Sequence, residues 1–378
     1  MGFGIYLHWP FCASKCPYCD FNSHVAARID QRRWAEAYRS ELRRVAALTQ
    51  DRVVNTVFFG GGTPSLMEAG TVAAVMAEIR SCWPVANNLE VTLEANPGSV
   101  EARRFAGFRA AGVTRISMGV QALDDADLRR LGRLHDVAEA QAAFAVARDL
   151  FDRVSFDLIY ARQHQTLAAW RDELRRALDM AVDHLSLYQL TIEEGTAFGA
   201  RAAAGGLCGL PEEGPAADMY DATQALCAAA DLPGYEISNH ARPGAESRHN
   251  LIYWRAGDWA GIGPGAHGRL TLGGVRHATE TASAPGDWLT RVERRGSGET
   301  GSVSLRQGEA GEEALMMGLR LQEGVDLERL ERLGLQISMN DISKLEDLGL
   351  LANAGGRITA TSRGRLLLNE VLRRLLRA

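Results

Sequence analysis

The chain has 378 residues, enough for one large hydrophobic core and a smaller appended domain. Hydrophobic residues make up 46% and charged residues 24% of the chain, a globular composition that argues against a disordered protein. A formal net charge of -5 leaves no basic field for nucleic acid or anionic lipid, and no apolar run is long enough to cross a bilayer.

The N-terminal string MGFGIYLHWPFC lacks the charged start and the long apolar core of a secretory signal. Six cysteines in a chain without such a signal indicate a reducing compartment, with metal or redox use rather than disulfides. These features predict a cytoplasmic protein.

Short runs rich in β-branched and aromatic residues alternate with amphipathic stretches rich in Ala, Arg and Leu. The predicted strands are Gly4–His8, Val53–Phe59, Glu90–Glu94, Arg115–Met118, Arg153–Leu158 and His184–Leu190. The predicted helices include Gln31–Leu48, Glu101–Ala111, Val137–Leu150 and Leu167–Met180. This alternation is typical of βα units with parallel strands, and six units are fewer than the eight of a closed barrel. The predicted fold class is therefore α/β, an open partial (β/α)6 barrel over residues 1–195, although a doubly wound sheet fits the same pattern.

The second half of the chain is expected to extend this barrel over residues 196–305. Gly205–Pro215 is predicted to leave the barrel as a loop before a helical stretch, Ala216–Ala230. Gly257–Gly274 is predicted to be a loop because GIGPGAHG lies at its centre. Over residues 306–378, helices and a short strand pair predict a smaller α+β, winged-helix-like domain. Because this domain mixes both charge signs, a structural cap is favoured over a DNA-binding role.

Three cysteines, Cys12, Cys16 and Cys19, follow the first predicted strand in the string CASKCPYC. The C-terminal ends of strands are where α/β barrels carry their chemistry. Thiolates are the usual ligands of iron–sulfur clusters, and three of them leave one iron of a four-iron cluster open to a substrate. Zinc is the alternative, because it takes four tetrahedral ligands and His8 or His24 could supply the fourth.

Glycines or polar residues also occur at the ends of the later strands. Gly60–Pro64 has the sequence GGGTP and lacks the Lys–Ser/Thr of a P-loop. Such a glycine cluster is most often a turn. Glycines also let the backbone approach a ligand closely. Glu94, Gln121 and Asp157 lie at the ends of the third, fourth and fifth predicted strands. Since these ends share one face, we expect the three side chains to converge on one cavity.

The string IYLHWPFCASKCPYCDF, with its CxxxCxxC spacing, resembles the signature of the radical S-adenosylmethionine (SAM) superfamily. It is most similar to the branch that contains the oxygen-independent coproporphyrinogen III oxidases and the haem chaperone HemW, and the resemblance covers nearly the whole chain. It implies a [4Fe-4S] cluster on the three cysteines, whose open iron binds SAM and whose electron cleaves SAM to a 5'-deoxyadenosyl radical. The residues on SAM-contacting or cluster-covering positions are Tyr6, Tyr18, Gly61, Gly62, Thr63, Glu94, Gln121, Arg133 and Asp157. After the fifth strand the family commonly has Gly-Leu-Pro, whereas this chain has Ala161-Arg162-Gln163.

Two functions stay open within this branch. One is an enzyme that decarboxylates the propionates of coproporphyrinogen III with a SAM-derived radical. The other is a haem chaperone that keeps the scaffold, binds haem and delivers it to acceptor haemoproteins, respiratory ones by resemblance. Phe21 stands where the oxidases carry a fourth cysteine, and their long N-terminal extension does not precede the first strand. The string HNLIYW at 249–254 matches the HNxxYW motif of the HemW branch, so the chaperone is favoured.

His249 offers an imidazole that can ligate haem iron, and Tyr253 and Trp254 offer flat apolar surface to a porphyrin. A buried, hydrogen-bonded histidine in an aromatic cluster is the physical alternative. The resemblance makes this segment the predicted haem site, near the junction with the C-terminal domain. His240 and His267 lie in the same region and are alternative ligands. The predicted cofactors are thus a [4Fe-4S] cluster, SAM and haem, with no catalytic residue assigned and no porphyrinogen decarboxylation expected. The predicted partner is a haem-accepting protein and not nucleic acid; transient contact with a membrane protein and a homodimer are open alternatives.

Overall fold

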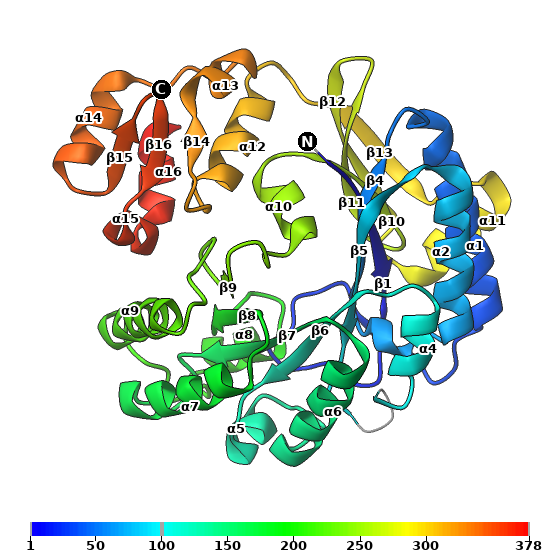
Figure 1. The fold of residues 1–378 in the computed structure, drawn as a ribbon, viewed down its shortest axis with the longest axis horizontal. Helices are drawn as coiled ribbons and strands as arrows, with labels where there is room; N and C mark the ends of the chain where they lie inside the picture. The colour runs from blue at the N-terminus through cyan, green and yellow to red at the C-terminus, as the bar shows by residue number, and fades with distance from the viewer. Residues whose placement is uncertain (1, 99–101, 377–378) are drawn as a thin grey trace.

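An eleven-stranded sheet forms the body of the molecule in the computed structural model, which describes residues 2–98 and 102–376 (Figure 1). Its strand order is β13-β12-β11-β10-β1-β4-β5-β6-β7-β8-β9. The strands that pair in parallel in chain order are β1 (Phe3–Trp9), β4 (Val54–Gly61), β5 (Val85–Ala95), β6 (Arg115–Gln121), β7 (Arg153–Tyr160) and β8 (His184–Gln189). These are the six strands predicted from the sequence, paired as a partial barrel requires.

Helices cover the outer face of these strands and bury their apolar sides against them. They are α1 (Gln31–Leu48), α2 (Ala69–Cys82), α4 (Phe105–Ala110), α5 (Asp125–Arg130), α6 (Val137–Leu150) and α7 (Leu167–Met180), with a short 3-10 turn, η1 (Pro64–Leu66). The helices α1, α6 and α7 begin and end at the predicted residues. Their starts are fixed by the side chains of Asp30, Asp136 and Thr166, which cap their first turns. The helix predicted from Glu101 is shorter: α4 begins at Phe105, and Glu101 itself lies outside the described residues.

The cysteine loop lies between β1 and α1. A small parallel pair, β2 (Phe11–Cys12) and β3 (His24–Val25), closes this loop on itself. The loop is thereby fixed at both ends next to the C-terminal end of β1.

Five further strands extend the sheet at its two edges. They are β9 (Asn239–Ala241) beside β8, β10 (Asp258–Ile262) parallel to β1, and the antiparallel strands β11 (His267–Leu272), β12 (Val275–Thr281) and β13 (Glu299–Ser304). The prediction of a loop over Gly257–Gly274 is therefore wrong, because β10 and β11 lie within this range. A Cβ on Gly261 would approach the His267 carbonyl oxygen to 2.2 Å, so this glycine permits close strand approach rather than a turn.

Four helices accompany this extension: α8 (Ala197–Ala203), α9 (Glu213–Ala229), α10 (Arg248–Trp254) and α11 (Pro285–Arg295). The helix predicted from Ala216 begins earlier, at Glu213. Pro215 fits its first turn because the N–H that proline lacks has no partner there. On one side α10 contacts β1, β4 and β10, and on the other it contacts α12, so it stands between the sheet and the C-terminal domain (Figure 1).

The C-terminal part of the chain folds beside the barrel, in the orange and red region of Figure 1. Its elements are α12 (Glu309–Gly318), β14 (Val325–Asp326), α13 (Leu327–Arg332), α14 (Met339–Asp347), β15 (Leu351–Ala354), β16 (Arg357–Ala360), α15 (Ser362–Leu366) and α16 (Leu368–Leu375). The three strands form a sheet of their own, and residues such as Leu315, Ile342 and Val371 build a hydrophobic cluster separate from that of the barrel. In the part of the chain that the structure describes, no helix combines the length and apolarity needed to cross a membrane.

Candidate functional site

The three cysteines of the loop after β1 are free thiols. Cys12 is buried, whereas Cys16 and Cys19 are partly exposed. The Thr63 hydroxyl donates a hydrogen bond to Cys12 Sγ at 3.3 Å, and Arg133 Nη1 donates one to Cys16 Sγ at 3.3 Å. Donors aimed at sulfur stabilise thiolates and tune a metal centre that the thiolates bind.

All three thiols line one cavity of about 400 Å³ at the C-terminal ends of the parallel strands. The predicted residues that line the same cavity are Tyr18, Gly61, Gly62, Thr63, Glu94, Gln121, Arg133 and Asp157. The side chains at the strand ends therefore converge on one cavity, as expected. We call this cavity, lined by the three cysteines and these eight residues, the mouth cavity.

Tyr6 is the one residue of that predicted set that does not line the mouth cavity. Its side chain packs against Phe58 and His249 inside the barrel, and its hydroxyl lies 3.0 Å from His8 Nδ1. Burial, and then the Glu94 carboxyl, raise the pKa of Tyr6. Contact with a ligand in the mouth cavity therefore remains a prediction for Tyr6.

No three Cys, His, Asp or Glu groups among residues 2–98 and 102–376 converge closely enough to hold a single metal ion. In a four-iron cluster each thiolate binds a different iron, so the cysteines surround a larger body than one ion. Three thiols around a shared cavity, two of them already facing hydrogen-bond donors, fit such a cluster.

Two partly buried carboxyl groups face the mouth cavity. Burial, and then the neighbouring Asp157, raise the pKa of Glu94 to about 8, although the Gly61 N–H opposes this by donating to Glu94 Oε2 at 3.2 Å. Burial raises the pKa of Asp157 to about 6, and the Ser186 hydroxyl is the chief opposing group. Among the described residues Asp157 Oδ1 has no hydrogen-bond partner. Carboxyl groups in this state favour a bound cation that restores their charged form.

Arg133 also lines the mouth cavity and is held there by three hydrogen bonds. Its Nη2 donates to Asn96 Oδ1 and to the Gly119 carbonyl oxygen, both at 2.8 Å, while Nη1 reaches Cys16. Gln121, at the end of β6, has a left-handed φ of 75°, a conformation that a residue other than glycine keeps only where its surroundings hold it.

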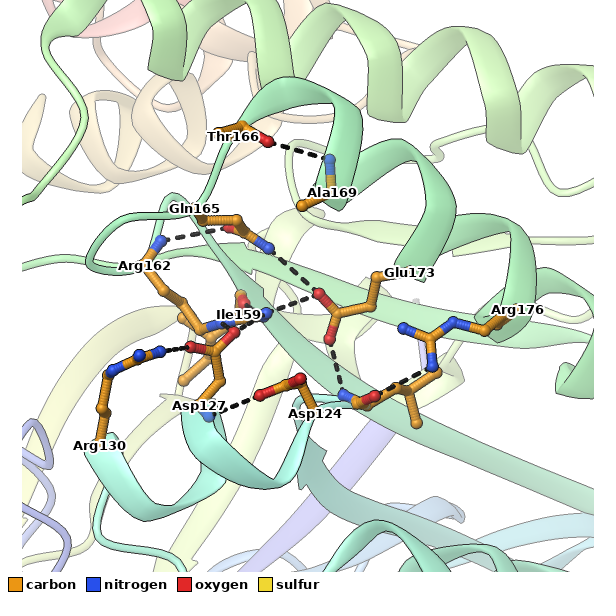
Figure 2. A network of polar contacts seen from close by, with 11 residues as sticks. Asp124, Asp127, Arg130, Ile159, Arg162, Gln165, Thr166, Ala169, Glu173 and Arg176 are labelled. Carbon is orange, nitrogen blue, oxygen red and sulfur yellow. Dashed lines mark hydrogen bonds and ion pairs between the residues drawn. The ribbon is translucent and has the colours of Figure 1, made fainter.

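The loop that departs from the family pattern is held by a buried ion network (Figure 2). Ala161 takes a left-handed φ of 57°. Arg162 is only 3% exposed and donates to Asp127 Oδ2 at 2.7 Å and to Glu173 Oε2 at 2.6 Å. The sequence identified this departure, and the structure resolves its shape: a buried arginine fixes the loop with two carboxylates.

The same network reaches the wall of the mouth cavity. Glu173 Oε1 accepts a hydrogen bond from the Leu123 N–H at 2.6 Å, two residues beyond Gln121. Asp127 belongs to α5, the helix that precedes Arg133. Arg162 therefore fixes, through its two carboxylates, the segment that carries both Gln121 and Arg133. Sequence reasoning missed this supporting role, because nothing in the local sequence links Arg162 to Asp127 or Glu173.

The HNLIYW segment forms α10, and His249 is fully buried within it. Its Nδ1 lies 2.7 Å from Thr56 Oγ1 of β4, and its Nε2 lies 2.7 Å from the Tyr253 hydroxyl. Burial lowers the pKa of His249 to about 3, so the imidazole is neutral. The structure thus places His249 as the hydrogen-bonded core histidine that the sequence analysis kept as an alternative.

Tyr253 and Trp254 line a second cavity, of about 670 Å³, which we call the junction cavity. Its other walls come from Glu236–Asn239 before β9, from Arg320 after α12, and from residues 365–370 of the C-terminal domain. His249 lies behind Tyr253 and does not line it. Tyr188, at the end of β8, lines both this cavity and the mouth cavity.

Two family models match the chain. Residues 6–177 match the model of the Radical SAM superfamily, and residues 305–367 match the model of the HemN C-terminal domain. The first match spans the cysteine motif and five of the six parallel strands. The second begins one residue before the predicted C-terminal domain and otherwise lies within it.

Curated relatives extend these matches over most of the chain. The protein named heme chaperone HemW of Mycobacterium tuberculosis (strain H37Rv) is 38% identical over 99% of this chain and 95% of its own length. Mouse radical S-adenosyl methionine domain-containing protein 1, named as mitochondrial, is 41% identical over 89% of this chain and 77% of its own length.

Among solved structures, coproporphyrinogen III oxidase (HemN) from Escherichia coli superposes with a TM-score of 0.82. The alignment covers 99% of this chain and 90% of that chain at 22% sequence identity. At this identity the likeness concerns the fold alone, and it confirms the predicted radical SAM partial barrel with a smaller C-terminal domain.

Proposed function

Because the chain belongs to the radical SAM superfamily, and within it to the family of HemW, we propose that it is a haem chaperone. It holds a [4Fe-4S] cluster and SAM in the mouth cavity and haem in the junction cavity. The observation that carries this proposal is the opening of the HNxxYW segment, through Tyr253 and Trp254, onto a cavity separate from that of the cysteines.

In the mouth cavity, Cys12, Cys16 and Cys19 would hold the cluster. When bound, the cluster supplies a coordination position for SAM and an electron for its reductive cleavage. The chain itself contributes the charges: Glu94 and Asp157 are carboxyl groups that a cationic ligand would ionise. SAM is such a ligand, since it carries an ammonium and a sulfonium group.

The remaining residues of the predicted SAM site shape this cavity. Gly61 and Gly62 lie beside the cysteine loop, where a Cβ on Gly62 would come within 2.7 Å of the Phe11 carbonyl oxygen. The backbone there can approach a nucleotide closely only because these positions are glycines. Arg133 donates a hydrogen bond to Cys16 Sγ, and Tyr18 lines the cavity with its ring centre 6.3 Å from that of Phe198.

In the junction cavity, Tyr253 and Trp254 offer aromatic surface to the porphyrin. His249 orients Tyr253 through the hydrogen bond between Nε2 and the hydroxyl. Direct ligation of haem iron by His249 requires its ring to leave both Thr56 and Tyr253, so we assign it the supporting role.

The proposal is tested by anaerobic reconstitution with iron and sulfide, followed by haem titration. The expected results are about four irons per chain, retention of haem, and transfer of haem to an apo-haemoprotein. In parallel, coproporphyrinogen III and SAM are supplied with an electron donor. SAM-dependent decarboxylation of coproporphyrinogen III would overturn the chaperone assignment in favour of the oxidase. Identification of the acceptor, a respiratory haemoprotein by family expectation, follows from capture of haem-loaded complexes.

A further inference from the structure

The junction cavity contains two arginines, Arg320 and Arg365, that have no carboxylate partner among the described residues. Arg320 donates to the Met316 carbonyl oxygen, and Arg365 Nε donates to the Ala360 carbonyl oxygen at 3.4 Å. A partly buried arginine elsewhere in the chain, Arg276, instead pairs with a carboxylate at 3.0 Å. Taking a guanidinium out of water without a counter-charge costs free energy, so two such groups at one cavity call for an anionic ligand.

The acidic residues that line the same cavity already have partners. Glu236 is buried, and its Oε1 accepts hydrogen bonds from the Ser238 N–H at 2.9 Å and from Asn239 Nδ2 at 2.7 Å. Glu370 pairs with two arginines of its own helix, Arg373 and Arg374. Burial lowers the pKa of Arg320, which Glu236 opposes, and the pKa of Arg365, which Tyr220 and then Glu236 oppose. The partners of Glu236 are neutral, and burial raises its own pKa. Two guanidinium groups thus face one buried carboxyl group, and the charge left over at the cavity is positive.

Part of the cavity wall is apolar and partly exposed. Leu366 is 40% exposed and Leu367 is 46% exposed, although both are large hydrophobic side chains at the start of the C-terminal helices. The Arg320 guanidinium lies 5.6 Å from the centre of the Trp254 ring, and Trp254 Nε1 has no hydrogen-bond partner in the described structure. The cavity therefore combines an apolar surface with two cations.

We propose that the junction cavity is the porphyrin site, with Arg320 and Arg365 binding the two propionates of haem. Trp254, Leu366 and Leu367 then cover the porphyrin surface. A volume of about 670 Å³ lies within the range of cavities that bury ligands of this class. The inference rests on the proposed function and adds the chemistry of recognition: a flat apolar body with two carboxylates.

This chemistry also distinguishes haem from coproporphyrinogen III. Haem carries two propionates, which match two arginines, whereas coproporphyrinogen III carries four and would leave two carboxylates without a cation. It further gives the C-terminal domain a direct role, because Arg320, Arg365 and both leucines belong to it.

The test compares haem with haem dimethyl ester, in which both propionates are neutral. R320Q and R365Q should each weaken haem binding roughly tenfold, and the double variant should weaken it roughly a hundredfold, the usual loss for charge-assisted hydrogen bonds. The ester should bind the wild type and the double variant with equal affinity. R306Q serves as the control, because Arg306 is exposed and remote from the cavity, and it should leave haem affinity unchanged. R320K and R365K, which keep the charge, should recover most of the lost affinity.

The outcomes separate the inference from the proposed function. Wild-type protein that retains haem, together with a double variant that binds haem equally well, overturns the inference and leaves the chaperone function standing. A double variant that loses haem and the ester to the same extent also overturns it, because the arginines would then serve the fold. Folded wild-type protein that binds no haem at all overturns the proposed function itself.

Discussion

The mouth cavity and the junction cavity bury ionisable groups of opposite kind. The mouth cavity presents two carboxyl groups, Glu94 and Asp157, whose pKa values are raised to about 8 and about 6. The junction cavity presents two arginines without a carboxylate partner in the described structure. In each case burial has removed water from an ionisable group and left the compensating charge to a ligand. Under the proposed function, this difference in ionisable groups would help direct a cationic nucleotide and a dianionic porphyrin to separate places.

The two cavities also differ in how the chain builds them. The mouth cavity is formed by the ends of consecutive barrel strands and by the cysteine loop. The junction cavity is formed where the end of β8, the loop before β9, α10 and the C-terminal domain meet. Substitutions in one cavity should therefore change one ligand and leave the other unaffected, which the following predictions test.

The largest effect is expected from removal of the cysteines. The triple variant C12A/C16A/C19A should lose essentially all cluster iron, from about four irons per chain, since these thiolates are its only predicted ligands. Haem affinity, measured without SAM, should not change. Iron and sulfide analysis and a haem titration measure the two quantities. C82A/C208A, which removes two thiols outside the cavity, is the control and should keep its iron. A loss of haem binding in the triple variant would contradict the expectation that the two cavities bind their ligands independently.

Arg162 should have the next largest effect, on stability. R162M leaves Asp127 and Glu173 without their buried cation, and we expect a loss of about 3–5 kcal/mol in the free energy of unfolding. R175M removes an exposed pair with Asp172 and should cost less than about 1 kcal/mol. Denaturant unfolding measures both.

The same variant sharpens the comparison between the cavities. Because the Arg162 network supports Gln121 and Arg133, R162M should weaken SAM binding while haem affinity stays unchanged. Equal losses for SAM and haem would mean that Arg162 stabilises the whole fold and has no specific link to the mouth cavity.

Glu94 should control SAM binding in a pH-dependent way. E94Q should weaken SAM binding by about 1–3 kcal/mol, the usual loss when a buried polar partner is removed. In the wild type, SAM affinity should rise as pH increases from 6 towards 8, because a cationic ligand requires the ionised carboxylate and the pKa of the free protein is about 8. Calorimetric titrations at several pH values measure this. A flat profile would contradict a role for Glu94 in cation binding.

The contribution of Glu94 to folding stability should fall as pH rises, whereas its contribution to SAM affinity should increase. The pKa of this carboxyl is raised to about 8 in the folded chain from an ordinary value of 4.5. Its contribution to stability is therefore present below the ordinary value and is lost as pH rises through about 8. E94Q, always neutral, should be more stable than the wild type above pH 8 and nearly equal to it near pH 4. Thermal unfolding at both pH values tests this, with E328Q on the surface as the control.

The smallest effect is expected from His249. H249A removes the partner of the Tyr253 hydroxyl, so the Soret band should shift and haem affinity should fall only a few-fold, about 1 kcal/mol. Iron content of the cluster should not change. H267A, at an exposed histidine, is the control. A loss of a hundredfold or more would instead make His249 a direct ligand of the iron.

Much of the barrel and of the mouth cavity could be predicted from the sequence. Parallel strands end at one edge, so Glu94, Gln121 and Asp157 were expected together, and the structure brings them together. The predicted helix Val137–Leu150 is also present, and the structure shows a capping box at its start, where the side chains of Asp136 and Glu139 satisfy each other's backbone N–H groups. These features depend on local sequence and on a regular topology.

The features that could not be predicted depend on long-range packing. The glycines of β10 and β11 resemble those of a loop, because close strand approach and a turn both require a missing side chain. Arg320 follows α12 and Arg365 belongs to α15, and no spacing or periodicity links them to Trp254. Their significance comes from the absence of a nearby carboxylate, which only the folded arrangement reveals.

Tyr188 is the exception to the separation of the two cavities, because its ring lines both. A ligand that orders this ring from one side changes the wall that the second ligand meets on the other. Thermodynamic reciprocity then applies: the factor by which SAM alters haem affinity equals the factor by which haem alters SAM affinity. Under the proposed function, this one side chain would therefore couple the binding of the nucleotide to the binding of haem.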